Sequence, residues 1–293
     1  MSKKRFHKIN IEISNICNLQ CSFCPEVLRQ KQLMSETLFE KIIQQVSGLT
    51  EMVCFHLMGD PLVHPSLGTF VDICQKYQVP IFLVTNGVLL QKKQVEILLK
   101  PAFHQVNFSL HSFSDNYPDR DPTIYLEKIF AYTEMAFEQC PQMYINYRLW
   151  NLTTVKGEDI KNTHILKRIE ERFGETLSNH VDVKNQKSIK IKNRLYLHFD
   201  TEFTWPSLDL PVLGTQGSCY GLKSHFGILV DGTVVPCCLD KEGRIPLGNL
   251  NDEGLTILDI LSNEKSQRIL NGFRNNQLIE DLCRRCQYIT RFQ

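Results

Sequence analysis

The sequence has almost no net charge and no long apolar run. Lys and Arg number 33 and Asp and Glu number 32, so the formal net charge is +1 over 293 residues. This balance provides no long-range attraction to nucleic acids or to membrane surfaces. No segment approaches the roughly 20 consecutive apolar residues of a membrane-spanning helix. We therefore expect no membrane association, and nucleic acid is a disfavoured partner.

The amino-terminal segment lacks the features of a secretory signal. Residues 1–14 are basic, but they contain neither an apolar core nor a small-residue cleavage site. We therefore expect a cytoplasmic protein. Apolar residues make up 42% of the chain, which is enough for a packed core. The length favours about two domains.

Cysteine, by contrast, is abundant and unevenly distributed. Of the 11 cysteines, three lie within residues 17–24 and five within residues 219–286. Disulfides are rare in a reducing compartment, so clustered thiols there indicate metal sites. The isolated residues Cys54, Cys74 and Cys140 are expected to be small buried core residues.

Apolar periodicity predicts an α/β chain in which strands alternate with helices. The expected strands cover residues 7–15, 51–57, 79–85, 105–111 and 143–150, and the expected helices cover 35–47, 66–78, 91–100, 123–138 and 158–173. This alternation predicts parallel βαβ units, either in a barrel or in an open parallel sheet. Both architectures place their chemistry at the carboxyl ends of the strands.

The pattern changes after about residue 185. An Asp-Gly pair at 231–232 lies between two apolar runs and predicts a β-hairpin over 226–235. Residues 255–273 are expected to form one helix. We place a domain boundary between residues 205 and 206, which gives domains of 1–205 and 206–293.

The first cysteine cluster has the spacing C-x3-C-x2-C. Cys17, Cys21 and Cys24 follow the first predicted strand directly. Three soft thiolates favour an iron–sulfur cluster or zinc. No fourth Cys or His lies nearby in the sequence, which leaves one coordination position open, as in a catalytic site. On spacing alone, a zinc site completed from elsewhere in the chain remains an alternative.

The segment from Cys17 to Cys24 resembles the signature of the radical S-adenosylmethionine (radical SAM) superfamily. Further segments resemble other elements of that family, and they contain Phe23, Gly59, Asp60, Pro61, Asn86, Ser109 and Arg148. The glycine–acidic–proline element departs from the usual pattern, since Met58 precedes a single glycine and Asp60 replaces glutamate.

The resemblance implies a fold and a chemistry. The fold would be a partial (β/α)6 TIM-like barrel followed by a small Cys-rich domain. The three cysteines would hold a [4Fe-4S] cluster whose fourth iron binds SAM, and one-electron cleavage of SAM would give a radical that abstracts hydrogen from a substrate. The cofactor contacts would come from the family-like residues: Phe23 at the adenine, Gly59, Asp60 and Pro61 at the amino group, and Asn86, Ser109 and Arg148 at the rest of SAM. Structural roles for Phe23, Asp60 and Arg148 remain open.

The second cysteine cluster resembles the auxiliary domain called SPASM or, in shortened form, twitch. Four ligands for a second [4Fe-4S] cluster would be Cys219, Cys237, Cys283 and Cys286. Cys238 would be a spare thiol, an alternative to Cys237 as ligand, or a hydrogen donor to a substrate radical. Zinc is an alternative metal, because four thiolates suit either.

The substrate is less well defined by the sequence. The first strand begins near residue 7, which leaves no room for an amino-terminal peptide-recognition domain and favours a small molecule. By size and truncated auxiliary domain the chain is similar to the queuine lyases, which release 7-aminomethyl-7-deazaguanine from queuine, a 7-deazapurine base. Expected substrate contacts are His111, Asn151, Glu202 and Trp205, because a purine-like base needs polar partners and an aromatic face.

Two other functions remain open. The chain could modify a ribosomal peptide as an epimerase or thioether former, or it could be a non-catalytic iron–sulfur electron carrier. If the chain is an enzyme, we expect a lyase in preference to a peptide-modifying isomerase or an oxidoreductase. Radical SAM chemistry implies an electron donor of the flavodoxin or ferredoxin type.

Overall fold

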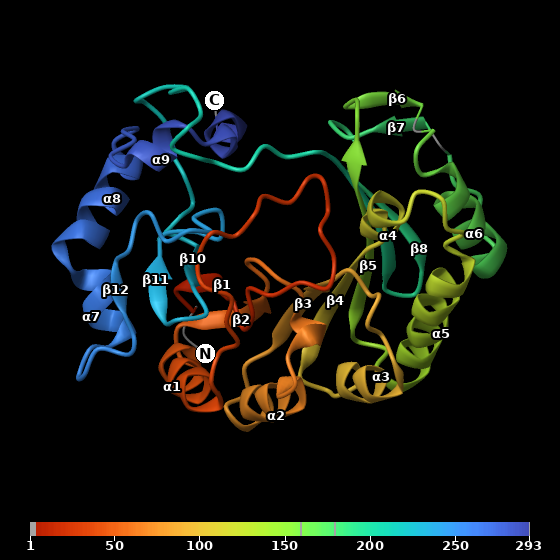
Figure 1. Cartoon of the computed structure of the whole chain (residues 1–293), viewed down its shortest axis with the longest axis horizontal. Coiled ribbons are helices and arrows are strands. Elements are labelled where there is room, and N and C mark those ends of the chain that lie inside the picture. Colours follow the sequence, from red (N-terminus) through yellow and green to blue (C-terminus); the bar gives the residue numbers. More distant parts are fainter. Residues whose placement is uncertain (1–3, 159, 179, 293) are drawn as a thin grey trace. The chain divides into compact units, whose positions relative to one another are not determined.

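The computed structural model describes residues 4–158, 160–178 and 180–292 (Figure 1). The chain folds into two compact units. Unit 1 comprises Met1–Cys17, Pro25–Ile81 and Thr204–Gln293, and unit 2 comprises Asn18–Cys24 and Phe82–Phe203. None of the helices within the described residues is long and apolar enough to cross a membrane.

Unit 1 contains a mixed sheet built around its first strand. In the order of the sheet the strands are β12 (Gly248–Asn249), β11 (Thr233–Val235), β10 (His225–Ile228), β1 (Phe6–Ile11) and β2 (Thr50–Phe55). Strand β1 pairs in parallel with both β2 and β10, whereas β10, β11 and β12 are antiparallel. The predicted hairpin is confirmed, and Gly232 adopts the positive φ of 87° that its turn requires.

The helices of unit 1 are α1 (Glu36–Val46), α2 (Leu67–Lys76), α7 (Ile257–Ser262), α8 (Glu264–Arg274) and α9 (Asp281–Arg284), with 3-10 turns η1 (Pro61–Val63) and η2 (Gln287–Phe292). Ser35 caps α1, as its position before an apolar stripe predicts, by accepting a hydrogen bond from Leu38 N at 3.2 Å. The single helix predicted over 255–273 is wrong. Asn263 has an extended backbone (ψ 161°) and caps α8 by accepting from Ser266 N, which divides the segment into α7 and α8.

Unit 2 contains a row of hydrogen-bonded strands that begins with β3 (Ile81–Thr85), from Phe82 onward. The following strands in the sheet are β4 (Phe103–Ser109), β5 (Tyr144–Leu152), β9 (Leu195–Thr201) and β8 (Ser188–Lys192). Strands β4, β5 and β9 are parallel, as expected of βαβ units, and β8 is antiparallel to β9. Strand β9 was not predicted, although apolar residues alternate along it. A separate two-stranded sheet joins β6 (Lys156–Glu158) and β7 (His180–Asp182).

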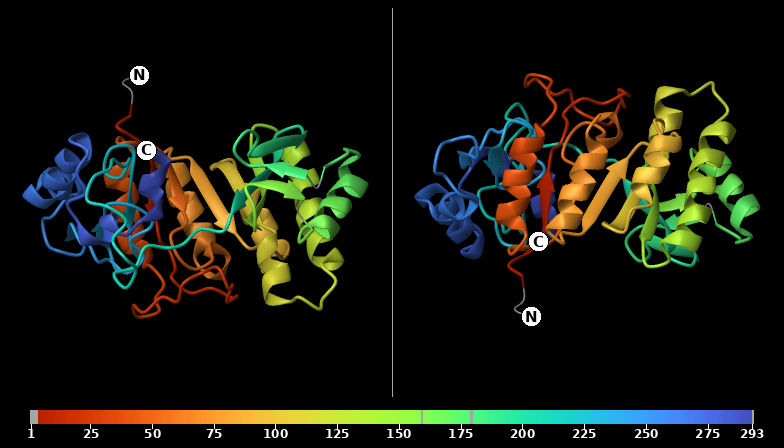
Figure 2. Two further views of the ribbon diagram at one scale, coloured as in Figure 1. Left: turned by 90° about the horizontal axis from the view of Figure 1, so that it is seen from above. Right: turned by 90° about the horizontal axis from the view of Figure 1, so that it is seen from below.

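The helices of unit 2 are α3 (Lys92–Leu98), α4 (His111–Asn116), α5 (Thr123–Gln139) and α6 (Thr163–Phe173). Helix α5 covers one face of β5, where the buried hydroxyls of Thr133 and Tyr147 share a hydrogen bond of 2.6 Å. Helix α6 lies beside α5 (Figure 2), and an ion pair of 3.0 Å between Arg168 and Glu127 joins them. Helix α6 begins at Thr163, five residues later than predicted, and β6 occupies 156–158.

The three isolated cysteines are core residues, as predicted. Cys54, Cys74 and Cys140 are all buried, with exposed fractions of 1%, 0% and 4%. None of the 11 cysteines, all of which lie in the described residues, forms a disulfide.

Candidate functional site

The C-x3-C-x2-C motif lies in the long loop between β1 and α1. In unit 1, the side chain of Asn15 fastens the two ends of this loop together. Its Nδ2 donates to Gln30 O at 2.7 Å, and its Oδ1 accepts from Gln32 N at 2.7 Å. A bridge between Ser14 and Leu33 adds a second closure. The residues between them therefore form a loop with a fixed base.

The turn after β2 packs on the backbone immediately before Cys17. Gly59 has a φ of 72°, and a Cβ there would lie 2.4 Å from Ser14 O and 2.7 Å from Ile16 O. Asp60 N donates to Ile16 O at 3.0 Å. Only glycine fits this close approach, so the family-like element at 59–61 supports the cysteine loop through its backbone.

The buried carboxylate of Asp60 also caps the following 3-10 turn. Its Oδ1 accepts from Leu62 N at 2.9 Å, with Pro61 at the first position of η1. His64 closes the other end, because its Nδ1 accepts from Ser66 N and its Nε2 lies 3.0 Å from Met34 O. Burial lowers the pKa of His64, so this ring is a neutral structural group.

A buried ion pair ties the cysteine loop to the carboxy-terminal part of unit 1. The guanidinium Nη2 of Arg29 lies 2.8 and 2.9 Å from the two carboxylate oxygens of Glu12, whose exposed fraction is 1%. Glu12 also accepts from Val230 N at 3.0 Å, and Arg29 Nε donates to Lys241 O at 2.7 Å. Burial raises the pKa of Glu12, while Arg29 and the Val230 amide oppose that shift.

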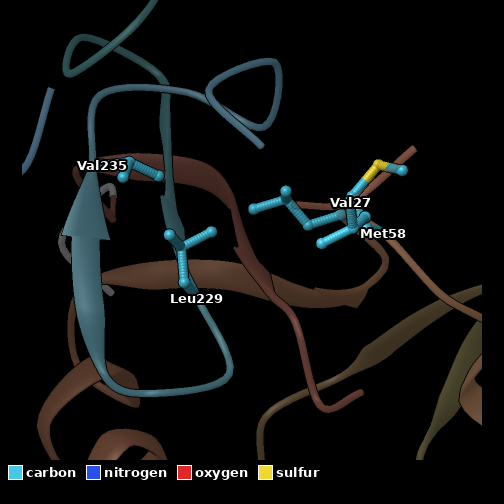
Figure 3. Packing of buried hydrophobic residues seen from close by; sticks show 5 residues of the cluster. Val27, Met58, Leu229 and Val235 are labelled. Carbon is cyan, nitrogen blue, oxygen red and sulfur yellow. The ribbon is translucent and has the colours of Figure 1, made fainter. Parts of the chain in front are cut away.

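A small apolar cluster makes a second connection in the same region. Val27 from the cysteine loop packs with Leu57 and Met58 and with Leu229 and Val235 of the hairpin (Figure 3). Two partly buried side chains, those of Trp205 and Cys238, pack against it. The loop that carries the first cysteine motif, the turn after β2 and the hairpin therefore share one core.

The carboxy-terminal cysteines of unit 1 lie near one another. Burial raises the pKa of Cys237, and the neighbouring thiols of Cys238, Cys219 and Cys283 raise it further. The pKa of Cys286 is raised to about 11, mainly by burial, with contributions from Cys219 and Cys238. Neighbouring, partly buried thiolates that repel one another need a bound cation, so this donor set fits an iron–sulfur cluster.

The tip of the cysteine loop belongs to unit 2, where helix α4 holds it. Asp115 accepts from Ser22 N at 2.7 Å and from Ser22 Oγ at 2.5 Å. Asn116 Oδ1 accepts from Gln20 N at 2.9 Å, and its Nδ2 donates to Cys21 Sγ at 3.1 Å. Cys21 is buried, whereas Cys17 and Cys24 are exposed. A donor directed at a buried sulfur stabilises the thiolate, which fits Cys21 as a cluster ligand.

His111, at the start of α4, supports the aromatic residue of the motif. The rings of Phe23 and His111 have centroids 4.8 Å apart. His111 Nδ1 lies 3.0 Å from Arg148 O, and burial lowers the pKa of His111 to about 4. His111 is therefore a neutral, buried group that positions Phe23 against the strand ends.

Asn86 connects the end of β3 to the cysteine loop within unit 2. Its Nδ2 donates to Asn18 Oδ1 at 2.9 Å, and its backbone oxygen accepts from Tyr125 OH at 2.7 Å. Its own Oδ1 accepts from Val88 N at 2.9 Å. The side chain is thus oriented toward the loop by contacts on two sides.

One face of the unit 2 sheet carries polar and aromatic side chains. Strand pairing places Ser109 on β4 opposite Arg148 on β5, and Arg148 opposite His198 on β9. The guanidinium of Arg148 lies 4.3 Å from the ring centroid of Trp150, and Trp150 Nε1 donates to His198 Nδ1 at 2.9 Å. Asp200, on the same face of β9, lies 3.0 Å from Lys187 Nζ. These half-buried groups are adjacent at the carboxyl ends of parallel strands.

The remaining predicted substrate contacts have other partners. The side-chain amides of Asn151 and Asn162 exchange two hydrogen bonds, of 2.8 and 3.2 Å. Glu202 is exposed and lies 3.5 Å from Lys161. Sequence reasoning missed Trp150, His198 and Asn116. The alternation along 195–201 could have revealed His198, but no local pattern indicates the contact of Asn116 with Cys21.

Among the residues that the structure describes, no three His, Cys, Asp or Glu side chains are grouped as ligands of one metal ion. The ligands of an iron–sulfur cluster bind separate irons. The two cysteine groups would therefore each hold a cluster, and their hydrogen bonds and thiol neighbours fit that role.

Comparison with protein families gives two matches. Residues 11–165 match the model described as Radical SAM superfamily. Residues 219–287 match SPASM, described as an iron–sulfur cluster-binding domain. The second match therefore indicates that the carboxy-terminal cysteines bind an iron–sulfur cluster and not zinc.

Relatives of known function match only part of their length. S-adenosyl-L-methionine-dependent 2-deoxy-scyllo-inosamine dehydrogenase from Niallia circulans is 28% identical over 37% of this chain and 46% of the relative. GTP 3′,8-cyclase from Chlorobaculum tepidum is 29% identical over 35% of this chain and 32% of the relative. The matches thus span less than half the length of these curated relatives.

Solved structures are similar over most of the chain. BtrN in complex with AdoMet and 2-DOIA has a TM-score of 0.56 at 19% identity, covering 98% of this chain and 94% of BtrN. Streptococcus suis SuiB bound to precursor peptide SuiA has a TM-score of 0.61 at 15% identity, covering 97% of this chain and 70% of SuiB. At these identities the likeness shows the fold: a partial-barrel α/β core with a Cys-rich carboxy-terminal domain.

Proposed function

Because the chain belongs to the radical SAM superfamily, we propose that it is a radical SAM enzyme that acts on a small planar molecule, a 7-deazapurine base such as queuine. Its cofactors are a [4Fe-4S] cluster with SAM and an auxiliary iron–sulfur cluster in the SPASM domain. When bound, the first cluster and SAM supply one-electron cleavage of SAM and hydrogen abstraction from the substrate. An electron donor of the flavodoxin or ferredoxin type is the proposed protein partner.

Two sets of cysteines are the proposed cluster ligands. Cys17, Cys21 and Cys24 hold the SAM-binding cluster in the domain of residues 1–205. The auxiliary cluster, in the domain of 206–293, is held by Cys219, Cys237, Cys283 and Cys286. One observation supports Cys237 over Cys238. Both thiols neighbour Cys219 electrostatically, but Cys238 packs against the apolar cluster around Val27.

The proposed SAM contacts follow the family-like positions: Phe23, Gly59, Asp60, Pro61, Asn86, Ser109 and Arg148. The contacts within each unit support this set. Asp60 and Gly59 are fixed beside the backbone that leads into Cys17, and Asn86 is oriented toward Asn18 in the loop.

The polar and aromatic face of β4, β5 and β9 is the single observation that carries the substrate class. A sheet face that only packs against the protein interior would be apolar. Here Trp150 offers an aromatic face, while Arg148 and Asp200 offer opposite charges. Aromatic surface with a few oriented polar groups is typical of small-molecule sites.

His198 adds a directed donor to this face. Because its Nδ1 accepts from Trp150 Nε1, the proton of the neutral ring resides on Nε2. Burial and the nearby Arg148 charge lower the pKa of His198, so the ring is neutral at physiological pH. A neutral donor beside a carboxylate and an indole matches the edge and the face of a deazapurine, whose ring offers both donors and acceptors.

On this proposal the reaction is a lyase reaction: cleavage at the aminomethyl nitrogen of queuine, with release of 7-aminomethyl-7-deazaguanine. Glu202 and Trp205 are proposed as further substrate contacts. His111 and Asn151, near the strand ends, are also proposed to face the substrate. The hydrogen bonds of His111 and Asn151 support a role in orienting their neighbours.

Equilibrium binding of queuine to the anaerobically reconstituted, SAM-loaded protein tests this function. Trp150→Leu and Asp200→Asn are each expected to weaken binding by roughly ten- to a hundredfold, since each removes about 1–3 kcal/mol of stacking or hydrogen bonding. Lys76→Gln, at an exposed ion pair in unit 1, is the control and should bind queuine as the unmodified protein does.

Each other outcome identifies a different function. Absence of queuine binding and cleavage, together with modification of a precursor peptide, would replace this proposal with a peptide-modifying enzyme. Absence of any 5′-deoxyadenosine above a Cys17→Ala control would leave the non-catalytic electron carrier.

A further inference from the structure

We propose that Asn116 is a positioning residue that sets the reduction potential of the SAM-binding cluster through its hydrogen bond to Cys21. The inference rests on the proposed assignment of Cys21 as a ligand of that cluster. The main observation behind it is a hydrogen bond within unit 2, in which Asn116 Nδ2 lies 3.1 Å from Cys21 Sγ.

The orientation of the Asn116 amide follows from its other partners. Its Oδ1 faces Gln20 N, which can only donate, at 2.9 Å. Its Nδ2 faces Ser112 O, which can only accept, at 2.9 Å. Flipping the amide would break both bonds, so the second N–H of Nδ2 is the group that points at Cys21 Sγ.

The loop is held on both sides of Cys21. Gln20 bonds to Asn116, and Ser22 bonds to Asp115 through both its amide and its hydroxyl. These contacts connect Asp115 and Asn116 of α4 to the two loop residues that flank Cys21. The distance between the amide and the sulfur is therefore fixed by the protein chain itself.

A hydrogen bond to a ligating sulfur affects the two oxidation states of a cluster unequally. One-electron reduction adds negative charge, part of which resides on the thiolate ligands, and an N–H donor stabilises that charge. Hydrogen bonds to the sulfurs are among the main determinants of cluster potential. Cys21 is buried, so water is a poor substitute for the amide. Removing the donor should therefore make the cluster harder to reduce.

The experiment is an anaerobic redox titration of the holoenzyme, followed by electron paramagnetic resonance. The SAM-binding cluster is identified as the signal that changes when SAM is added, because only a cluster with an open iron can bind it. Asn116→Leu removes the donor without adding charge, and Asn116→Asp keeps the acceptor for Gln20 while replacing the donor with a carboxylate oxygen. Both variants should shift the midpoint potential of that signal to more negative values, Asn116→Asp further than Asn116→Leu.

The auxiliary cluster and a loop variant serve as controls. The potential of the SAM-insensitive signal should stay constant in both variants. Ser22→Ala loses one bond to Asp115 but leaves the Asn116–Cys21 contact intact, so its potential should match that of the unmodified protein. Asn116→Gln, which retains an amide donor, should recover part of the shift, and iron content with thermal unfolding verifies that each variant is loaded and folded.

The outcomes separate this inference from the assignment on which it rests. If the SAM-sensitive signal survives in Cys21→Ala with unchanged iron content, Cys21 is not a ligand and the assignment fails. If the signal depends on Cys21 but Asn116→Leu leaves its potential unchanged, the assignment stands and the role of Asn116 is refuted. A shift in Asn116→Asp alone would also refute it, since added charge rather than the lost hydrogen bond would be the cause.

Discussion

Alanine at Cys17, Cys21 or Cys24 is expected to abolish SAM cleavage. Each thiolate holds one iron of the proposed cluster, and the fourth iron is available to SAM only if the other three are occupied by the protein. Loss of any one ligand leaves an iron without its thiolate and destabilises the cluster to which SAM would bind. Anaerobic incubation with SAM and dithionite, with chromatographic measurement of 5′-deoxyadenosine, should give no product above background for each variant.

The matched control is Cys54→Ala, which removes an isolated thiol buried in β2. This variant should form 5′-deoxyadenosine as the unmodified protein does, after correction for folded material. Turnover retained in any of the three loop variants would reject the ligand assignment for that cysteine.

Replacing Arg29 with methionine is expected to lower the free energy of unfolding by about 3–5 kcal/mol, because removing one partner leaves a buried charge uncompensated. Glu12 has an exposed fraction of 1%, and its remaining partner would be the Val230 amide. Urea denaturation at neutral pH measures the loss. Most of it should be recovered in the double variant Glu12→Gln/Arg29→Met, in which neither charge remains.

The pH dependence of the free energy of unfolding distinguishes an unpaired buried charge from lost packing. Burial already raises the pKa of Glu12, and removal of Arg29 would raise it further. A carboxyl whose folded-state pKa is raised is destabilising above its unfolded-state pKa. The loss of unfolding free energy in Arg29→Met should therefore become smaller as the pH falls and Glu12 becomes protonated. A deficit that is independent of pH, or one that the double variant does not reduce, would contradict this account of the pair.

Local sequence patterns predicted the features that depend on neighbours in the chain. The apolar stripe and Ser35 located α1, and Asp231-Gly232 located the hairpin. The helix pattern over 255–273 misled because periodicity does not show where a side chain competes for the backbone. There, Asn263 caps α8 with its own oxygen and interrupts the helix.

The parts of the site that were missed depend on long-range contacts. Asn116 reaches Cys21 across 95 positions of the chain, and Trp150 reaches His198 across 48. Neither pair leaves a periodic signal. Likewise, Asn151 follows the strand predicted over 143–150, whereas in the structure it lies within β5 and exchanges hydrogen bonds with Asn162, whose position depends on the segment before α6.

Iron and acid-labile sulfide, measured together on the anaerobically reconstituted protein, test the central claim most directly. Two four-iron clusters predict about eight irons and about eight sulfides per chain, with no zinc. Substitution of Cys21 or Cys283 by alanine should halve both values. About four irons accompanied by one zinc, or iron without sulfide, would contradict the assignment of one SAM-binding and one auxiliary cluster to the two cysteine groups.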